Sequence, residues 1–447
     1  MSVSSPAVSG GRATLPRAAA RRHVLLVAYH FPPEPVAGAL RPSFLARYLP
    51  LFDWEATVLT SGASRGGGDG DPVVVPASDL FERFLRPKAA VDGIAAATAN
   101  PTPRTVRWAK ELCKSLLLFP DRAAGWIPAA IARALAITRR QHFDAVISTS
   151  PPVSAHIVAC AVALRRGLPW VADYRDLWHG NPYVERGPAR TRVEFELERW
   201  LRRHASEITA VSRDLLGRQE RVFGPASSEA IPPAFDPAEW DAIDDVRPKD
   251  FRLTYAGTLY EGRSRLDMLL SAIARLRSEA DPAGFAARVD YYGPDEQLVL
   301  RLAAARDLSD VVICHGVTER RLVLTALRRS AALIVLLNMD PDTAAELGGK
   351  VFECVGARRP IIAIGPRGGA VQAFIERHAL GWFAWDDHTT ADALRSAYTR
   401  FAAGRYALDP GGSPGGITTA QEVARRFARL LDRTVRTRGP LSLYFPV

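Results

Sequence analysis

The stretch GGKVFECVGARRPIIAIG, residues 348–365, determines how the second half of the chain folds. A Gly-Gly turn opens a helical pattern shortly after an apolar run, and Pro360 ends that helix before a second apolar run begins. Short apolar runs that alternate with helices are typical of buried strands in a parallel sheet. The stretch therefore predicts a strand–helix–strand unit of an open α/β sheet.

The same alternation extends in both directions from this stretch. Strands are expected near 253–256, 288–292, 311–314, 332–337, 361–364 and 382–385, with helices between them. Parallel strands with intervening helices form a doubly wound sheet, which binds ligands in the loops at the carboxyl ends of its strands. The sequence thus predicts a Rossmann-like domain over residues 251–415.

The first half begins with a similar pattern. An apolar run at 23–29 leads through a Pro- and Gly-rich loop into a helical pattern near 39–48, and a second run follows at 55–60. This order opens a parallel doubly wound sheet, whereas the Gly- and Asp-rich stretch 61–80 is expected to be a loop. Further strands are expected near 145–148, 170–173 and 208–211.

These patterns predict an α/β fold of two Rossmann-like domains whose parallel sheets face each other across a cleft. The expected parts are a disordered basic leader at 1–22, an N-terminal domain at 23–230, a linker at 231–250, the C-terminal domain at 251–415, and a helix and tail at 416–447. We expect the last helix to pack back on the N-terminal domain.

Composition narrows the classes of function. The 447 residues are 47% hydrophobic and carry a formal net charge of +10, which suits nucleic acid, an anionic membrane or a phosphorylated substrate. No known nucleic-acid module is evident in the sequence, so nucleic acid is not an expected partner. Four widely spaced cysteines, the lack of a signal-peptide pattern and the lack of an apolar run of about 18 residues favour a cytoplasmic protein with peripheral membrane contact at most.

Gly348, Gly349 and Lys350 stand at the start of the expected helix in the 348–365 stretch. Free N–H groups and the positive end of the helix dipole at such a start attract a diphosphate. Lys350 adds a cation, and Glu353, one turn further on, is placed to accept hydrogen bonds from ribose hydroxyls. The alternative is an ordinary Gly-capped helix with a surface lysine and glutamate.

This stretch resembles the donor-binding signature of the family 4 retaining glycosyltransferases, in which a Lys or Arg precedes an aromatic residue, a Glu, and a Gly-Pro or Arg-Pro pair. The resemblance implies the GT-B fold, with a nucleotide-sugar site in the C-terminal domain and an acceptor site in the N-terminal domain. The signature usually has two glutamates separated by seven residues. Glu353 matches the second, whereas Ala345 stands at the first and Glu346 lies one place further on.

A second stretch, YAGTLYEGR at residues 255–263, resembles the first strand and loop of the donor domain in the same family. The backbone of Gly257 and the side chain of Thr258 are expected to approach a phosphate closely. Arg263 is the expected counter-charge to the leaving diphosphate, because a planar guanidinium binds two phosphate oxygens at once. A surface arginine on a tight turn is the alternative. Arg263 and Lys350 are therefore candidate catalytic residues.

Two stretches of the first domain give candidates on the acceptor side. HFPPEPVAGALR, residues 30–41, resembles the family's acceptor-side loop, in which Gly38 lets the backbone approach the donor phosphates and Arg41 reaches the site from the following helix. A plain strand-to-helix turn is the alternative. In STSPPVSAH, residues 148–156, His156 is either a residue of the cleft or a packed core histidine.

The stretch ADYRDLW, residues 172–178, together with residues 148–156, resembles a subgroup that takes part in bacterial cell-surface polysaccharide synthesis. Mixed charges directly after a buried strand are costly without a ligand or a partner. We expect an aspartate here to hold the acceptor hydroxyl, with Asp173 as the catalytic candidate and Arg175 and Asp176 as substrate-binding residues. The alternative is a structural Arg–Asp pair that fixes the loop.

Two other features give further expectations. The basic segment 81–127 is dotted with Phe, Leu and Trp, and either lies on an anionic bilayer, where polyprenyl-linked acceptors reside, or is a helix with a solvated basic face. Asp340-Pro341-Asp342 has the spacing of a metal-binding Asp-x-Asp. Since lysine, arginine and a helix dipole already neutralise a diphosphate, we expect neither a metal nor another cofactor.

The resemblance implies transfer of a sugar from a nucleotide-diphosphate sugar to a glycan or polyprenyl-linked acceptor, with retained configuration. It also implies a role in cell-surface polysaccharide or glycolipid synthesis, at the inner face of the membrane. One alternative is a sugar-nucleotide epimerase of the same architecture, although converging acid/base carboxylates and histidines are not evident. A second alternative, motivated by Ala345, is a degenerate transferase that binds nucleotide sugars without turnover.

Overall fold

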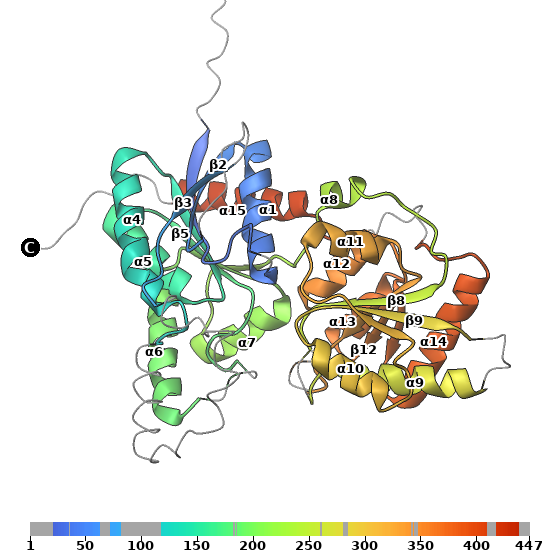
Figure 1. Ribbon diagram of the computed structural model, residues 1–447. Coiled ribbons are helices and arrows are strands. Elements are labelled where there is room, and N and C mark those ends of the chain that lie inside the picture. Colours follow the sequence, from blue (N-terminus) through green and yellow to red (C-terminus); the bar gives the residue numbers. More distant parts are fainter. Residues whose placement is uncertain are drawn as a thin grey trace, which may run out of the picture.

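Two α/β domains lie side by side in the computed structural model, each built on a parallel sheet with helices on both faces (Figure 1). This architecture confirms the predicted fold class. The structure describes residues 21–34, 36–62, 72–81, 118–181, 184, 186–259, 262–279, 285–340, 343, 347–408 and 417–437.

The N-terminal sheet has seven strands among the described residues, all parallel, in the order β3-β2-β1-β4-β5-β6-β7. The central strands are aliphatic and buried on both sides, as parallel strands under two layers of helices must be. The strands are β1 (Arg22–Val27), β2 (Trp54–Thr60), β3 (Val73–Pro76), β4 (Ala145–Ser150), β5 (Trp170–Tyr174), β6 (Glu207–Ala210) and β7 (Ser228–Ala230).

Helices cover both faces of this sheet. Local sequence sets their ends: Pro188 begins one helix, Gly167 ends another in the left-handed region, and the Ser212 hydroxyl caps a third. They are η1 (Ala37–Ala39), α1 (Leu40–Tyr48), η2 (Leu49–Phe52), η4 (Ala124–Trp126), α4 (Ile127–Arg140), α5 (Ser154–Arg166), α6 (Pro188–His204) and α7 (Arg213–Phe223).

The C-terminal sheet has six described parallel strands in the order β10-β9-β8-β11-β12-β13, which repeats the crossover pattern of the first sheet. The strands are β8 (Phe251–Ala256), β9 (Ala287–Tyr292), β10 (Val312–Cys314), β11 (Ala332–Leu336), β12 (Ile361–Ile364) and β13 (Gly381–Ala384). The helices are α9 (Leu266–Glu279), α10 (Glu296–Ala304), α11 (Arg320–Arg328), α12 (Gly349–Ala357), α13 (Ala370–Arg377) and α14 (Asp387–Ala402).

Two crossings of the chain join the domains. The first contains α8 (Pro237–Asp241), which packs Trp240 so closely on α12 that a Cβ added at Gly356 would overlap the indole. The second runs beside it, because Ala420 N donates to Phe235 O at 2.9 Å. The last helix, α15 (Ala420–Thr437), then buries Phe427 and other apolar residues in the core of the N-terminal domain, beside α1 (Figure 1).

Three expectations differ from the structure. Residues 73–76, expected within a loop because Gly and Asp dominate the residues before them, form β3, a half-exposed edge strand of three valines and a proline that pairs with β2 alone. The expected linker contains α8, whose N-cap Asp236 accepts a hydrogen bond from Ala238 N. β1 begins at Arg22, one residue inside the expected leader.

Candidate active site

Loops at the carboxyl edge of the C-terminal sheet bring Lys350 and Gly257 together. Lys350, at the start of α12, donates from Nζ to Tyr255 Oη at 2.9 Å and lies 4.7 Å from the centroid of that ring. Gly257 follows β8 with φ +140°, and a Cβ added there would overlap Lys350 Nζ. Glycine is therefore needed at residue 257 for both its backbone angle and its space.

Aromatic residues that the sequence analysis did not single out hold this loop. Tyr255 stacks on Tyr291 with ring centroids 6.0 Å apart, and its hydroxyl donates to Thr258 O at 2.8 Å. Asp295 accepts from Leu259 N at 2.8 Å and from the Tyr291 hydroxyl at 3.1 Å. Tyr255 and Tyr291 lie at the carboxyl ends of β8 and β9, and Asp295 follows β9. That position was the available signal, because this edge of a parallel sheet binds ligands.

The surroundings of Lys350 suit an anion. Burial lowers the pKa of Lys350 from its usual value, and the nearby charge of Glu353 opposes that shift. A bound phosphate would supply the negative charge that stabilises the ammonium form.

The start of α12 faces open space. Gly348 and Gly349 are exposed, a Cβ added at either would meet nothing within 4 Å, and no described side chain caps this helix. The N–H groups of an uncapped first turn and the helix dipole favour an anion there. Thr258 is exposed, as is Arg263, whose backbone carbonyl accepts from Met339 N at 3.3 Å.

Glu353 lies one turn into α12 and is paired with a residue that the sequence analysis missed. Arg320, the first residue of α11, donates from Nη1 to Glu353 Oε1 at 2.6 Å. The same guanidinium donates to both carboxylate oxygens of Glu239 on α8, at 3.0 and 2.7 Å. These three residues are far apart in the sequence, so no local pattern indicated their contact.

In the N-terminal domain, Asp173 is fully buried and fully bonded. Arg41 donates to its two oxygens from Nε and Nη2, each at 2.9 Å. The hydroxyls of Thr149 and Thr209 donate to it at 2.8 and 2.7 Å. Burial opposes the charge on Asp173, but Arg41 and the two hydroxyls lower its pKa overall. This geometry disagrees with the expectation that Asp173 holds an acceptor hydroxyl, since no face of the carboxylate reaches the surface.

Arg41 also departs from its expected role. It is buried, and besides Asp173 it donates to the carbonyls of Ile231 and Pro232 at 3.0 and 3.1 Å. The side chain thus anchors the first residues of the domain crossing instead of reaching into the site. The structural Arg–Asp pair, foreseen as an alternative, exists, but Arg41 supplies the arginine.

Arg175 joins three loops at the carboxyl edge of the first sheet. It donates to the carbonyls of Gly38 at 2.9 Å and Ser150 at 3.2 Å, and to that of Pro151. The structure therefore brings Gly38 and Arg175 together, but the guanidinium is bonded to backbone atoms of the protein. Asp176, next to it, remains exposed.

His156 is a core histidine. It is fully buried, its Nδ1 lies 2.7 Å from the Ser148 hydroxyl, and that hydroxyl also accepts from Trp170 Nε1 at 2.8 Å. Burial lowers the pKa of His156 to about 3, so the ring is neutral near pH 7. The expectation that His156 binds substrate is wrong, and the core alternative agrees with the structure.

A histidine of the quoted 30–41 stretch does reach this edge. His30 follows β1, and its Nδ1 lies 2.7 Å from Glu34 Oε2. A Cβ added at Gly38 would lie 3.3 Å from the His30 ring, so this ring and Gly38 are neighbours. The His30–Glu34 pair is a candidate that the sequence analysis did not weigh, although its position directly after the first strand was a usable signal.

Some expectations lie outside the described residues: Ala345 and Glu346, Pro341 and Asp342, and most of the basic segment 81–127. Within the part that the structure describes, no group of three or more His, Cys, Asp or Glu has an arrangement suited to a metal, and no helix has the length and apolarity to cross a membrane.

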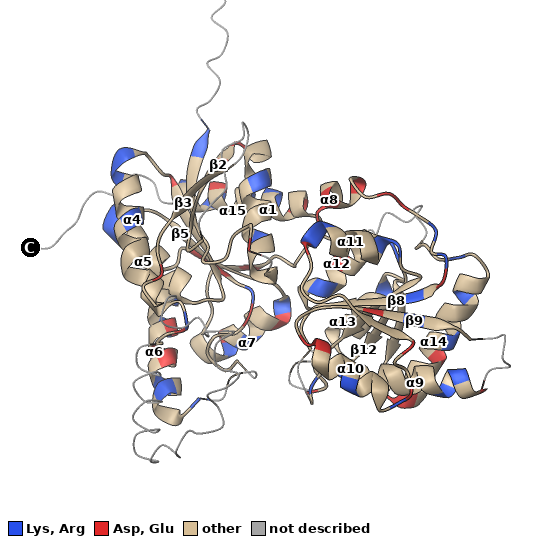
Figure 2. Ribbon diagram, viewed as in Figure 1, with Lys and Arg blue, Asp and Glu red and all other residues tan. Residues whose placement is uncertain are grey.

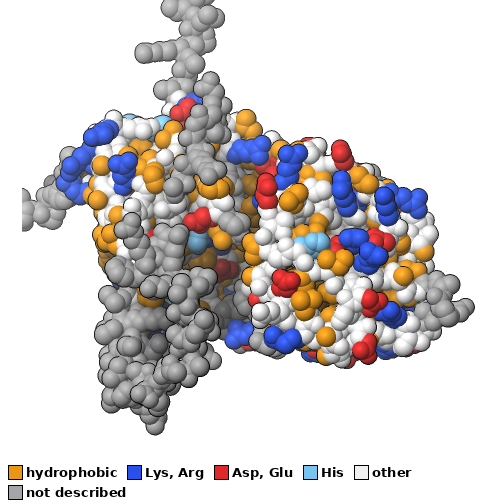
Figure 3. All heavy atoms as spheres, viewed as in Figure 1, with side chains coloured by type: hydrophobic (Ala, Val, Ile, Leu, Met, Phe, Trp, Pro, Cys, Tyr) orange, Lys and Arg blue, Asp and Glu red, His pale blue; other side chains and the backbone are white. Residues whose placement is uncertain are grey.

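Described Lys and Arg are scattered over both domains among acids (Figure 2), and a groove separates the domains on one face (Figure 3).

Residues 44–239 match the model of Glycosyltransferase Family 4. Among solved structures, sucrose-phosphate synthase from Thermosynechococcus elongatus is similar at 13% identity and TM-score 0.62, over 93% of this chain and 100% of that one. Anabaena HepE is similar at 12% identity and TM-score 0.59, over 92% and 100%. The lipopolysaccharide outer core galactosyltransferase WaaB is similar at 12% identity and TM-score 0.51, over 93% and 99%. No curated protein matches the sequence.

The two Rossmann-like domains and these likenesses define the fold as GT-B. Together with the match of residues 44–239 to Glycosyltransferase Family 4, this fold confirms the predicted resemblance and supports a glycosyltransferase.

Proposed function

We propose that the chain transfers a sugar from a nucleotide-diphosphate sugar to a glycan or lipid-linked acceptor. The observation that carries this proposal is the open, uncapped start of α12 with Lys350 held against the loop after β8. The known proteins support the donor class, because HepE was solved with UDP and with UDP-glucose, and TarM with UDP and α-GlcNAc-glycerol.

In this proposal the C-terminal domain stabilises the leaving group. Cleavage of the sugar–phosphate bond leaves new negative charge on the diphosphate. Lys350, Arg263 and the N–H groups at Gly348 and Gly349 would offset that charge. The backbone at Gly257 and Thr258 would lie against the phosphates, where a side chain at residue 257 is excluded.

Retention of configuration is part of the proposal and follows a same-face route. Asp173 is already bonded on both oxygens, so it is not available as a nucleophile for a covalent intermediate. The acceptor oxygen would bond to the anomeric carbon on the face that the phosphate leaves, and the leaving phosphate would take the acceptor proton. Domain closure would exclude water from this step.

We propose that the donor site needs no metal, because a lysine, an arginine and a helix start supply the positive charge. We further propose that the protein works in the cytoplasm, at the inner face of the membrane, in cell-surface polysaccharide or glycolipid synthesis. This cellular role rests on the resemblance of residues 172–178. The proposal of a donor site does not depend on it.

Thermal shift with UDP-, GDP-, ADP- and dTDP-sugars, without and with Mg²⁺, tests the donor site. A ligand that binds only the folded state raises the unfolding midpoint. We expect one nucleotide class to raise it without metal, and Lys350→Ala to remove the rise. Lys249→Ala is the matched control, since Lys249 is exposed and far from α12 in the sequence.

Three outcomes would change the account. No shift with any nucleotide sugar would contradict the donor site, and a shift that requires Mg²⁺ would contradict the metal-free proposal. A shift without release of the nucleoside diphosphate in the presence of glycan or polyprenyl-linked acceptors would favour the non-catalytic alternative.

A further inference from the structure

We propose that Arg320 is a positioning residue that holds Glu353 in place to bind the ribose of the nucleotide, and that Glu239 on α8 fixes Arg320 in turn. The proposal rests on the donor site proposed above and adds a residue outside the quoted sequence motifs. Arg320 would act through Glu353 and would not itself touch the sugar that is transferred.

The geometry of α12 orders the two ends of a nucleotide. Lys350 and Glu353 are three residues apart, so their side chains lie on the same face of the helix. With the diphosphate at Lys350 and the helix start, the ribose would lie one turn further on. Glu353 uses Oε1 for Arg320, and an ionised carboxylate has about four acceptor positions, so capacity remains for ribose hydroxyls.

Arg320 is held as firmly as the glutamate that it orients. Its guanidinium makes a two-point contact with Glu239 and a third bond to Glu353, and its side chain is 36% exposed against 26% and 24% for the two glutamates. Burial alone would lower the pKa of Arg320, but the bonds to Glu239 and the charge of Glu353 raise it overall. The forked geometry of arginine suits this double contact, which a lysine does not reproduce.

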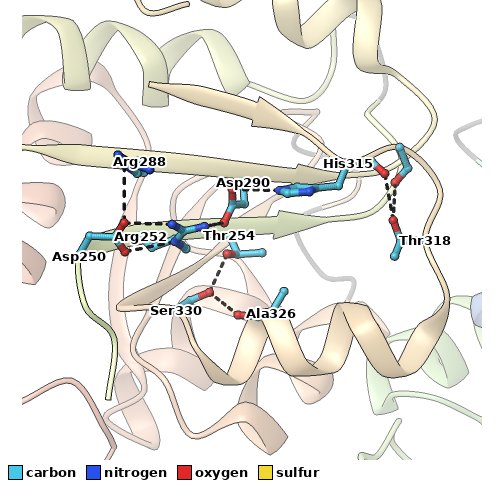
Figure 4. A network of polar contacts seen from close by, with 10 residues as sticks. Asp250, Arg252, Thr254, Arg288, Asp290, His315, Thr318, Ala326 and Ser330 are labelled. Atoms are coloured by element: carbon cyan, nitrogen blue, oxygen red, sulfur yellow. Dashed lines mark hydrogen bonds and ion pairs between the residues drawn. The ribbon is translucent and has the colours of Figure 1, made fainter. Parts of the chain in front are cut away.

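The loop before α11, which contains His315 and Thr318, is bonded to the sheet (Figure 4). Asp290, buried in β9, lies 3.1 Å from His315 Nε2 and accepts from Arg252 Nη1 at 2.7 Å. Thr318 then donates to the carbonyl of His315 at 3.0 Å, two residues before the helix begins. The loop that delivers Arg320 is thus fixed to the sheet.

Loss of Arg320 would leave Glu353 and Glu239 as unpaired like charges on packed helices. Like charges repel and each carboxylate would turn toward solvent. The ribose would lose an oriented acceptor, whereas the diphosphate would keep Lys350. The proposal therefore separates two readouts: recognition of the ribose and affinity for the phosphates.

Isothermal titration with UDP, GDP, ADP and dTDP, and then with the 2′-deoxy and 3′-deoxy forms of the one that binds, measures both readouts. We expect wild type to bind the deoxy form about tenfold more weakly than the ribonucleotide when the missing hydroxyl is the one that donates to Glu353. We expect Arg320→Gln to weaken the ribonucleotide by about tenfold and to reduce that discrimination to about twofold or less. Arg320→Lys should restore part of it.

Four further proteins make the measurement specific. Arg321→Gln removes the same charge from the next, exposed position of α11 and should leave affinity and discrimination unchanged. Lys350→Ala should weaken the ribonucleotide and the deoxynucleotides equally. Glu353→Gln should resemble Arg320→Gln, and the double variant should be no worse than either single one, because both remove the same interaction.

The results separate the two proposals. If none of UDP, GDP, ADP and dTDP binds wild type, the donor site fails and this inference fails with it. If a nucleotide binds through Lys350 but Arg320→Gln keeps full discrimination, or matches Arg321→Gln, the positioning role is wrong while the donor site stands.

Discussion

The two sheets have the same strand order, but the charged residues at their carboxyl edges differ in how many bonds they make within the protein. At the first edge, Asp173, Arg41 and Arg175 are bonded to other parts of the N-terminal domain and to the start of the domain crossing. At the second edge, Lys350 meets one hydroxyl and the helix start beside it faces open space. A charged residue after a buried strand therefore indicates a ligand site only when other residues of the protein do not already occupy its hydrogen-bonding positions.

The largest expected effect belongs to the first edge. Asp173→Asn would leave the Arg41 guanidinium buried without its counter-charge, which costs about 3–5 kcal/mol in the free energy of unfolding. Chemical denaturation followed by tryptophan fluorescence measures this loss. Asp176→Asn, next to the same loop but exposed, is the control and should change stability by less than about 0.5 kcal/mol. Equal effects for the two variants would mean that Asp173 is not the structural centre described above.

The next effect belongs to the second edge. Lys350→Ala should weaken nucleoside diphosphate binding by about tenfold to a hundredfold, because a charge-assisted contact to phosphate is lost. Stability should change far less than in Asp173→Asn. Isothermal titration beside denaturation gives both values for each variant. A Lys350→Ala protein that unfolds readily but binds normally would reverse the comparison.

Two glycines sharpen the comparison within the second edge. Gly257→Ala would displace Lys350 and strain a backbone with φ +140°, so we expect about 1–3 kcal/mol of lost stability together with weaker binding. Gly348→Ala meets no protein atom within 4 Å and should keep stability within about 0.5 kcal/mol, while its methyl group hinders a phosphate at the helix start. Unchanged binding in Gly348→Ala would show that the open space at residue 348 is not occupied by the donor.

The last effect concerns pH and develops only below neutral pH. The folded state lowers the pKa of His156 from 6.5 to about 3, so His156 stays neutral in the folded protein while it takes up a proton in the unfolded chain. Its contribution to stability is therefore lost as the pH falls below about 6.5, by at most about 1.4 kcal/mol per pH unit down to pH 3. Denaturation from pH 7 to pH 4 should show a steeper loss of stability in wild type than in His156→Gln, because other titrating groups, Asp173 among them, contribute to both proteins. Equal slopes would place the proton uptake elsewhere.

Sequence reasoning predicted the features that depend on local pattern. The strand at 361–364 was expected at the same residues that form β12, and Lys350 was expected at the start of a helix that does begin there. Both follow from short-range rules for buried strands and helix ends. By contrast, β3 was expected as part of a loop because the Gly- and Asp-rich residues before it dominated the stretch, although its three valines were a usable signal for a short strand.

The roles of charged residues were harder to predict because their partners are distant in the sequence. Asp173 is bonded to Arg41, 132 residues away, and Arg320 contacts Glu239 across 81 residues. Composition and spacing around 172–178 are the same whether an aspartate there binds a ligand or an internal arginine. The distinction depends on tertiary contacts, which no local motif contains.

Hydrogen–deuterium exchange with and without the nucleotide sugar selected by thermal shift tests the central claim most directly. We predict the strongest protection at the amides of 348–352, where the N–H groups of the first helical turn would bond to the diphosphate, and at Thr258, with less change at 172–178. Protection concentrated at 148–154 and 172–178, with none at 348–352, would contradict it and place the donor at the N-terminal edge.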